Sequence, residues 1–356
     1  MTNYRVAVIG LGRMGSTIDD EGHSTLPYSV AAATRASDRL ELVAGCDLLA
    51  ERRDDFRRRW KVDALYEDYV EMIRQEAPDL VAVCTAACVP KPAREAPDPQ
   101  FRSDSHADLT VAVAELGVSM LYVEKAMASS MARADEIRDA VRARGTVFNT
   151  GVLRRFDNRY DIVREAILAG HIGEPRVVVH YAASSLMHGH IHSIDTVSWL
   201  LGDPTITHVR GELLPRNTVV EDNFLASDPN ATYQLRFDGG IEAWSVPGAY
   251  WEFEVLGSEG AVRSFNNGAG APGLRLATDG RTWEEHKLAA AEPYSTTQFC
   301  LEDLVRGFED KVPTRGHIDV THHITEVCLA VAQSHRDGGV WVELPGVDSD
   351  LYVFHV

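Results

Sequence analysis

Residues 4–16 read YRVAVIGLGRMGS, a short apolar run followed by Gly10, Gly12 and Gly15 in G-x-G-x-x-G spacing. In such a loop the first glycine permits a tight turn and the second lets the backbone approach a pyrophosphate. The third lets the following helix pack closely on the strand. The stretch therefore predicts a dinucleotide-binding βα unit, with the phosphate groups held at the start of the next helix.

A second apolar run, LELVAGCD at residues 40–47, ends on Asp47. A carboxylate here accepts hydrogen bonds from the adenosine ribose and repels a 2′-phosphate, so NAD is predicted in preference to NADP. Asp47 lies farther from the glycines than the usual ~20 residues, and we attribute the excess to an extra loop at 16–27. Two alternatives stay open: Arg52 and Arg53 could accommodate a 2′-phosphate by turning inward, and Asp47 could simply cap the strand end.

Strand-like and helical segments alternate from the glycine loop to Gly151. After Asp47 these segments are 66–77, 79–86, 106–117, 118–126, 131–145 and 146–152. Such alternation predicts a parallel sheet with helices on both faces and ligands at the carboxyl ends of the strands. We therefore predict a Rossmann domain over residues 1–151, with a cofactor site that includes Gly10, Gly12, Arg13, Met14, Gly15, Asp47 and Thr85. Residues 86–105, rich in proline and charge, are predicted to form a long loop over the cleft.

The composition is that of a folded protein of two domains, with 356 residues, 45% hydrophobic and 25% charged. A formal net charge of −18 argues against nucleic acid as a partner, because binding its phosphates needs a basic face. The sequence shows neither a signal-peptide pattern nor a membrane-length apolar run, so we expect a cytoplasmic protein. The five cysteines lack C-x-x-C spacing and are expected to be reduced thiols without a metal.

The second half of the sequence changes in character. A helix, a glycine turn and a strand are expected within residues 161–183, and further strand patterns follow at 205–213, 231–240, 241–246, 250–265, 274–280 and 281–288. Short connections of this kind predict an antiparallel or mixed open sheet. Residues 319–339 form a helical pattern that can pack on that sheet. The fold class is therefore an α/β Rossmann domain followed by an α+β domain over residues 152–356.

Glu124 and Lys125 directly follow an apolar strand on the predicted cofactor edge of the first domain. A lysine there can act as a fixed cation or as a proton donor to a substrate hydroxyl beside the nicotinamide. The alternative is an ordinary Glu-Lys pair on the surface.

These features together resemble the glucose-fructose oxidoreductase, inositol dehydrogenase and MocA (Gfo/Idh/MocA) family over nearly the whole chain. The resemblance lies in the G-L-G-R-M-G loop, Asp47, His106 opening a helix, Glu124-Lys125, the Arg155-Phe156 segment and the Gly-Glu-Pro turn at 173–175. The family signature is Glu-Lys-Pro, and Ala126 stands where the proline belongs. The resemblance implies that His106, Glu124 and Lys125 contribute to the cofactor site.

The stretch HGHIHSID at residues 188–195 carries three histidines at alternate positions. If it is helical, His188 and His192 share a face that Asp195 joins, whereas His190 points elsewhere. One interpretation is a zinc site, which would need a third ligand. A second is a set of histidines satisfied by hydrogen bonds at a helix start. The third is a proton-handling site, because imidazole titrates near neutral pH.

The resemblance favours the third interpretation. Family members carry an Asp, a His four residues later and another Asp three residues on, and His188 stands here in place of the first Asp. The resemblance implies that His192 accepts a hydroxyl proton, that Lys125 binds the developing oxyanion, and that Arg155, His188 and Asp195 bind substrate. His188 also counts among the catalytic candidates. Because three cationic side chains would share one pocket, we expect a substrate that bears a carboxylate.

The resemblance implies an NAD-dependent oxidoreductase that interconverts a secondary alcohol and a ketone on a sugar, cyclitol or sugar-acid-like substrate. It also implies a homodimer or homotetramer formed through the C-terminal sheet. Three alternatives stay open: NAD-assisted glycoside cleavage or elimination with transient oxidation, a ligand-sensing relative without catalysis, and a metal-dependent hydrolase.

Overall fold

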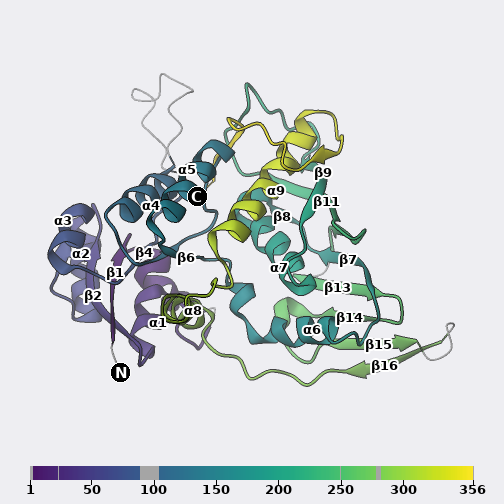
Figure 1. Ribbon diagram of the computed structural model, residues 1–356, viewed down its shortest axis with the longest axis horizontal. Helices are drawn as coiled ribbons and strands as arrows, with labels where there is room; N and C mark the ends of the chain where they lie inside the picture. The colour runs from purple at the N-terminus through teal and green to yellow at the C-terminus, as the bar shows by residue number, and fades with distance from the viewer. Residues whose placement is uncertain (1–2, 23, 89–103, 249, 278–281, 356) are drawn as a thin grey trace. The chain divides into compact units, whose positions relative to one another are not determined.

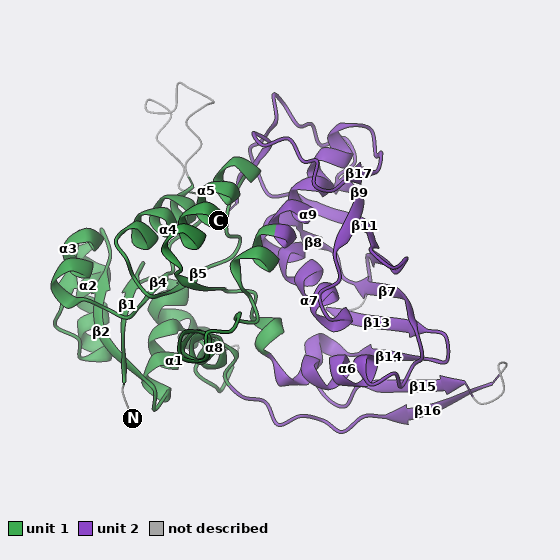
Figure 2. Ribbon diagram, viewed as in Figure 1, with its two compact units in different colours: residues 1–156, 295–322, 356 green, residues 157–294, 323–355 purple. Residues whose placement is uncertain are grey.

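The computed structural model describes residues 3–22, 24–88, 104–248, 250–277 and 282–355. Most of the predicted 86–105 loop therefore lies outside the described residues. The chain divides into two compact units (Figure 1, Figure 2). The first comprises residues 1–156 and 295–322 together with residue 356, and the second comprises residues 157–294 and 323–355.

The first unit is built on a parallel sheet in the order β3-β2-β1-β4-β5-β6. Its strands are β1 (Tyr4–Ile9), β2 (Leu40–Cys46), β3 (Leu65–Tyr66), β4 (Leu80–Val83), β5 (Met120–Val123) and β6 (Val147–Thr150). Successive residues such as Val6, Ala7 and Val8 are all fully buried, because helices cover both faces of a parallel sheet. The predicted Rossmann fold is confirmed, and the strand order reverses at β1 and β4.

The helices of this unit follow the strands, and two of the long ones are not predicted from the sequence. They are α1 (Val30–Ala36), α2 (Ala50–Trp60), α3 (Tyr69–Glu76), α4 (Ser105–Glu115), α5 (Met131–Arg144), α8 (Thr296–Asp310) and the short η3 (Leu153–Phe156). One of these is α2, and the other is α8, which comes from late in the chain and packs against α1, β5 and β6. Its Cys300, Leu301 and Leu304 are fully buried in the same core as Val8 and Tyr122. The predicted boundary after Gly151 thus differs from the observed units, because an apolar helix face returns to complete this core.

As the sequence predicts, extra residues at 16–27 separate the glycines from the next helix: the chain forms two short turns, η1 (Arg13–Thr17) and η2 (Ile18–Glu21), and α1 begins at Val30. The Asp19 carboxylate accepts hydrogen bonds from the backbone N–H groups of Tyr28 and Ser29 at 2.7 and 3.1 Å, and the Ser29 hydroxyl caps α1. The extra residues at 16–27 are therefore folded back and held by Asp19. The backbone N–H groups nearest the glycine loop belong to a single turn rather than to a long helix.

The second unit contains a mixed sheet in the order β16-β15-β14-β13-β7-β12-β11-β9-β17, with β8 paired to β11. Its strands are β7 (Pro175–Tyr181), β8 (Ser184–Ser185), β9 (Ile206–Leu214), β11 (Asn230–Phe237), β12 (Glu242–Val246), β13 (Glu252–Gly257), β14 (Gly260–Ser264), β15 (Gly273–Ala277), β16 (Trp283–Lys287) and β17 (Val342–Glu343). The β7–β12 pair is parallel and its neighbours are antiparallel. The predicted mixed sheet is confirmed.

Three long helices lie along this sheet: α6 (Asn158–Leu168), α7 (Ile191–Leu201) and α9 (Ile318–Arg336) (Figure 2). Contacts join α7 to β7 and α6 to β14. A Cβ at Gly211 in β9 would lie 2.6 Å from the Val331 side chain of α9, which shows how closely this helix packs. The smaller elements are η4 (Leu186–His190), η5 (Asn266–Gly268), β10 (Phe224–Leu225) and β18 (Tyr352–Val353). Within the described residues, no helix is long and apolar enough to cross a membrane.

Candidate active site

The glycine loop at the end of β1 is shaped by two glycines that no larger residue can replace. Gly10 has a φ of +90° and its N–H donates to the Cys46 carbonyl at 2.8 Å. A Cβ on Gly10 would lie 2.7 Å from the Cys84 backbone, and a Cβ on Gly15 would lie 2.0 Å from the Gly10 oxygen. Both glycines therefore serve the close approach of backbone to backbone.

Gly12 is different because the space above it is closed only by a side chain. A Cβ there would come within 3.4 Å of the Arg52 guanidinium, and the Arg52 side chain is 50% exposed. Since a long exposed side chain can move, the Gly12 backbone is open to a pyrophosphate. The loop thus fits a dinucleotide, which Gly10, Gly12 and Gly15 would hold through the main chain.

Asp47 lies directly after β2 and is tied to the glycine loop. Its Oδ2 accepts a hydrogen bond from the Leu11 N–H at 2.9 Å, and its Oδ1 accepts one from the Leu49 N–H at 2.9 Å. Arg52 lies 3.5 Å from the same carboxylate. Arg53 instead donates to the Asp47 and Leu48 carbonyls at 2.6 and 3.1 Å. Of the two arginines, Arg52 is the one that turns toward the glycine loop.

Three other predicted cofactor residues lie around this loop. Arg13 is exposed and forms an ion pair with Glu21 at 2.6 Å. The hydrogen bond to Glu21 raises the pKa of the Arg13 guanidinium above its usual value. Met14 is half-buried and packs against the core. Thr85 follows β4, and its hydroxyl lies 3.0 Å from the Ser105 hydroxyl at the start of α4. All three stay predicted ligands of the cofactor.

Glu124 and Lys125 lie at the carboxyl end of β5, at the same sheet edge as Gly10 and Thr85. The buried Glu124 carboxylate accepts a hydrogen bond from the Tyr122 hydroxyl and one from the Lys125 N–H at 3.4 Å. A Cβ on Gly151 would lie 2.8 Å from Glu124, so a glycine is required beside the carboxylate. The Lys125–Ala126 peptide bond is cis. The Lys125 side chain is half-buried.

Tyr122 is a residue that the sequence analysis does not single out. It lies two residues before Glu124, so both side chains point to the same face of β5. Burial raises the pKa of its hydroxyl well above the usual range, with Glu124 adding to the shift. The neutral hydroxyl is therefore a permanent donor to Glu124. The period-two spacing of a tyrosine and a glutamate on a buried strand is the signal that indicates this pair.

His106, at the start of α4, is almost fully buried at 1% exposure. Its Nδ1 lies 2.8 Å from the Ala126 carbonyl and its Nε2 lies 2.8 Å from the Thr85 carbonyl. Both ring nitrogens thus contact the main chain of the two strand ends. A role of His106 at the cofactor site stays a prediction.

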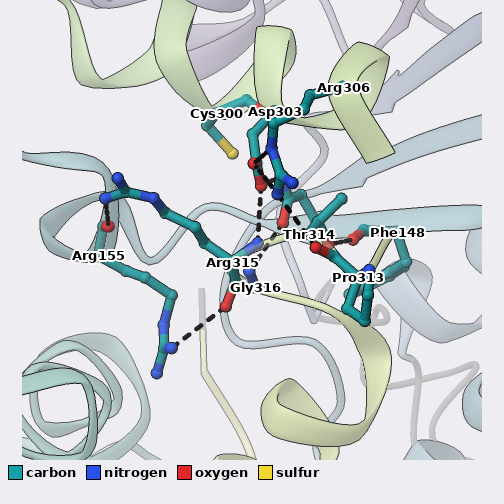
Figure 3. A network of polar contacts seen from close by, with 10 residues as sticks. Phe148, Arg155, Cys300, Asp303, Arg306, Pro313, Thr314, Arg315 and Gly316 are labelled. Atoms are coloured by element: carbon teal, nitrogen blue, oxygen red, sulfur yellow. Dashed lines mark hydrogen bonds and ion pairs between the residues drawn. The ribbon is translucent and has the colours of Figure 1, made fainter. Parts of the chain in front are cut away.

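Arg155 is fully buried within the first unit. Its guanidinium donates to the Arg315 carbonyl at 3.2 Å, and the Arg315 guanidinium donates to the Arg155 carbonyl at 3.0 Å (Figure 3). Asp303 accepts from the Arg315 N–H at 2.7 Å and so fixes the other side of this turn. The reciprocal contact joins η3 to the segment after α8. A role of Arg155 in substrate binding stays a prediction.

The three histidines of the HGHIHSID stretch, His188, His190 and His192, lie on η4 and at the start of α7. The Asp228 carboxylate accepts hydrogen bonds from the Met187 and His188 N–H groups, each at 2.7 Å, and a Cβ on Gly189 would overlap Ser184. The segment from His188 to His190 is therefore a wider helical turn than the α-helix expected there. Asp228, which holds this turn, comes from a distant loop and no local spacing could have indicated it.

The residues of the HGHIHSID stretch differ in how far their side chains are exposed to solvent. His188 is exposed, His192 is half-buried and Asp195 is 2% exposed. His190 is fully buried, with Nε2 2.8 Å from the Ala231 carbonyl and Nδ1 3.0 Å from the Ser193 hydroxyl. Burial lowers the pKa of His190 to about 4. His190 therefore belongs to the hydrogen-bonded core.

A zinc site has no support in the part of the chain that the structure describes. Within those residues, no group of three or more histidine, cysteine, aspartate or glutamate side chains could hold a metal ion. The five cysteines are buried and free of disulfides.

Comparison with known proteins identifies the first unit. A family model for oxidoreductases with an NAD-binding Rossmann fold, Gfo/Idh/MocA, matches residues 4–152. Over these residues the chain is similar to the Gfo/Idh/MocA family. The predictions of this family, of NAD as the cofactor and of an NAD-dependent oxidoreductase acting on CH–OH groups are thereby confirmed.

Several relatives of known name extend the likeness beyond the Gfo/Idh/MocA domain. The chain is 25% identical over 278 residues to the NAD⁺-dependent scyllo-inositol 2-dehydrogenase of Bacillus subtilis, covering 72% of each chain. The solved aldose-aldose oxidoreductase of Caulobacter crescentus superposes with a TM-score of 0.76 at 18% identity, over 96% of this chain and 100% of that one. An inositol dehydrogenase homologue of Azotobacter vinelandii was solved with NADH and myo-inositol. It superposes with a TM-score of 0.73 at 17% identity, over 96% of this chain and 98% of that one. At these identities the solved structures show the shared fold.

Proposed function

We propose that this chain is an NAD-dependent dehydrogenase that interconverts a secondary alcohol and a ketone on a polyol or sugar-like substrate. The observation that carries the proposal is the placement of Lys125 at the sheet edge that also holds the glycine loop and Asp47. Ligands of doubly wound sheets bind at this edge. The inositol and aldose oxidoreductases named above support a polyol as the substrate class.

Lys125 and His192 are the proposed catalytic residues. Bound NAD supplies a hydride acceptor for the carbinol carbon. The Lys125 ammonium donates a hydrogen bond to the carbinol oxygen and stabilises the charge that develops on it. The His192 imidazole accepts the hydroxyl proton. In the direction of ketone reduction, the protonated His192 imidazole donates the one proton that the oxygen needs, and the Lys125 ammonium donates a hydrogen bond to the same oxygen.

The neighbours of these residues have positioning roles in the proposal. Glu124, held by Tyr122, orients the main chain of Lys125. Asp195, three residues beyond His192 on α7, binds substrate and orients the imidazole. His188, exposed on η4, contacts substrate in this proposal. Arg155 joins this set if its guanidinium leaves the Arg315 carbonyl.

The substrate is proposed to bear a carboxylate, because Lys125, His188 and Arg155 are all potential cations. The experiment is a panel of paired neutral sugars or cyclitols and their acid forms, each incubated with NAD⁺ while NADH formation is followed. Faster turnover of the acids supports this part of the proposal, and faster turnover of the neutral compounds overturns it. Glycoside cleavage without net NADH formation would instead assign the chain to the transient-oxidation class.

The outer face of the sheet in the second unit is proposed to mediate homo-oligomerisation. Trp244 of β12 is 41% exposed and Leu256 of β13 is 36% exposed. Trp244 pairs with Val179 of β7 in the sheet register, so apolar side chains adjoin across strands. Light scattering should show a dimer or tetramer that Trp244→Glu dissociates. A monomeric wild-type protein would contradict this assembly.

A further inference from the structure

The side chain of His106 is a buried link between two strand ends. The ring is 1% exposed, and its nitrogens each lie 2.8 Å from a main-chain carbonyl oxygen, Nδ1 from Ala126 and Nε2 from Thr85. Thr85 follows β4, and Ala126 follows Lys125 after β5. One side chain thus contacts both loops that border the proposed hydride-transfer site on the first unit.

The chemistry of the two partners fixes the role of the ring. A carbonyl oxygen can only accept a hydrogen bond, so both contacts are hydrogen bonds only when both ring nitrogens carry a proton. A neutral ring would place a lone pair against one of the two carbonyls, which is unfavourable in a buried site. Two N–H donors would satisfy both carbonyls.

His190 provides the contrast within the same chain. Its Nε2 also contacts a carbonyl, that of Ala231, but its Nδ1 faces the Ser193 hydroxyl, which can donate. A neutral ring satisfies both partners there, and burial lowers the pKa of His190 to about 4. His106 and His190 are buried to a similar extent, but both partners of His106 can only accept hydrogen bonds, whereas one partner of His190 can donate.

We propose that His106 is a positioning residue that donates from both ring nitrogens and so fixes the Lys125 turn against the Thr85 loop. The proposal rests on the function assigned above. The Lys125 main chain is then held on both sides, by Glu124 at its N–H and by His106 at the next carbonyl. A lysine ammonium placed in this way keeps its direction toward the carbinol oxygen while the cofactor binds and leaves.

The charged side chains on the segments that contact the ring are consistent with a doubly protonated imidazole. These are Asp104 and Asp108 on the α4 side and Glu124 and Lys125 on the β5 side, and the described residues Thr85–Ala87 carry none. The Asp104 carboxylate accepts hydrogen bonds from the Ala107 and Ser129 N–H groups at 3.1 and 2.7 Å. Asp108 pairs with Arg133. The three carboxylates of this surrounding, Asp104, Asp108 and Glu124, face two cations, Lys125 and Arg133.

The test that does not depend on activity is the protonation of the ring itself. With ¹⁵N-histidine label, the His106 resonances are assigned by their loss in His106→Gln. The expected result at neutral pH is two protonated nitrogens for His106 and one for His190. A single protonated nitrogen on His106 overturns the proposal, whether or not the enzyme turns over the polyols of the panel. Absence of turnover with two protonated nitrogens overturns the assigned function instead.

The second test separates positioning from general stability. His106→Gln should lower kcat by about 10- to 100-fold while the Kd for NADH changes less than about threefold. The matched control is Thr110→Val, one turn along α4, whose buried hydroxyl has no hydrogen-bond partner among the described residues. The control should leave kcat and Kd unchanged. Unchanged kcat in His106→Gln, or an equal loss in both variants, overturns the positioning role.

Discussion

The Asp47 carboxylate accepts a hydrogen bond from the Leu11 N–H at 2.9 Å. The residue proposed to bind the adenosine ribose therefore also fixes the first turn of the glycine loop. Asp47→Asn keeps an oxygen for Leu11 but removes the charge. We expect NADH to bind about tenfold more weakly, because hydrogen bonds to a charged group contribute ~1.5–3 kcal/mol.

The same variant should shift cofactor preference toward NADPH, since the repulsion of a 2′-phosphate is lost and Arg52 lies 3.5 Å away. Fluorescence titration with NADH and NADPH measures both affinities. Asp63→Asn is the control, because the Asp63 side chain is 95% exposed. An unchanged ratio of the two affinities in Asp47→Asn would remove Asp47 from cofactor selection.

Gly15→Ala and Gly12→Ala should fail in different ways. A Cβ on Gly15 would overlap the Gly10 oxygen at 2.0 Å, so we expect a loss of more than about 3 kcal/mol in the free energy of unfolding. A Cβ on Gly12 meets only the mobile Arg52 side chain at 3.4 Å, so stability should change by less than about 1 kcal/mol while NADH binding is lost. Urea denaturation and NADH titration measure the two effects. Similar stability losses in both variants would disagree with the loop geometry.

Tyr122→Phe should destabilise the chain by about 1–3 kcal/mol, because it removes a donor from the buried Glu124 carboxylate. Tyr181→Phe is the matched control, since Tyr181 also donates to a glutamate, Glu254 at 2.7 Å, but in a half-buried setting. Removal of the Tyr181 hydroxyl should lower the free energy of unfolding by less than removal of the Tyr122 hydroxyl. Urea denaturation of both variants, with kcat measured alongside, checks the comparison, and an equal or smaller loss for Tyr122→Phe would contradict it.

His190 should make the chain less stable as the pH falls. Burial lowers its pKa from 6.5 to about 4 in the folded state. Above pH 6.5 the ring is neutral in both states and there is no effect. Between pH 6.5 and 4 the unfolded chain binds a proton that the folded chain does not, so stability falls by up to about 3 kcal/mol. His190→Gln should flatten the dependence of unfolding free energy on pH in this window. An identical pH dependence in the variant would show that His190 does not titrate as described.

Local sequence patterns were sufficient to predict the parallel sheet of the first unit and the edge of that sheet where the cofactor is expected. The glycine spacing and the strand ending on Asp47 depend on residues near one another in sequence. The same holds for Glu124-Lys125 after β5, because a short apolar strand brings its own end to the sheet edge. These features could be predicted from the sequence, and the Rossmann fold and NAD-binding family are confirmed.

Long-range contacts account for what the sequence could not indicate. Helix α8 completes the core of the first unit although it lies about 140 residues beyond Asp157 in the chain (Figure 2). Its periodicity predicts a buried face but does not indicate which core that face joins. Asp228 holds the His188 turn from another loop. Asp19 folds the extra residues before α1 back on themselves. The packing of α8 and the Asp228 contact join residues far apart in the chain, which no spacing rule predicts.

The most direct test of the proposed mechanism is the rate of NADH formation by Lys125→Ala and His192→Ala with the best substrate of the panel. Both variants should bind NADH with nearly unchanged Kd and lose at least ~100-fold in kcat. The double variant should be little slower than either single variant, because groups that act in one step are not additive. Near-normal kcat in both single variants would contradict the mechanism and remove Lys125 and His192 from it.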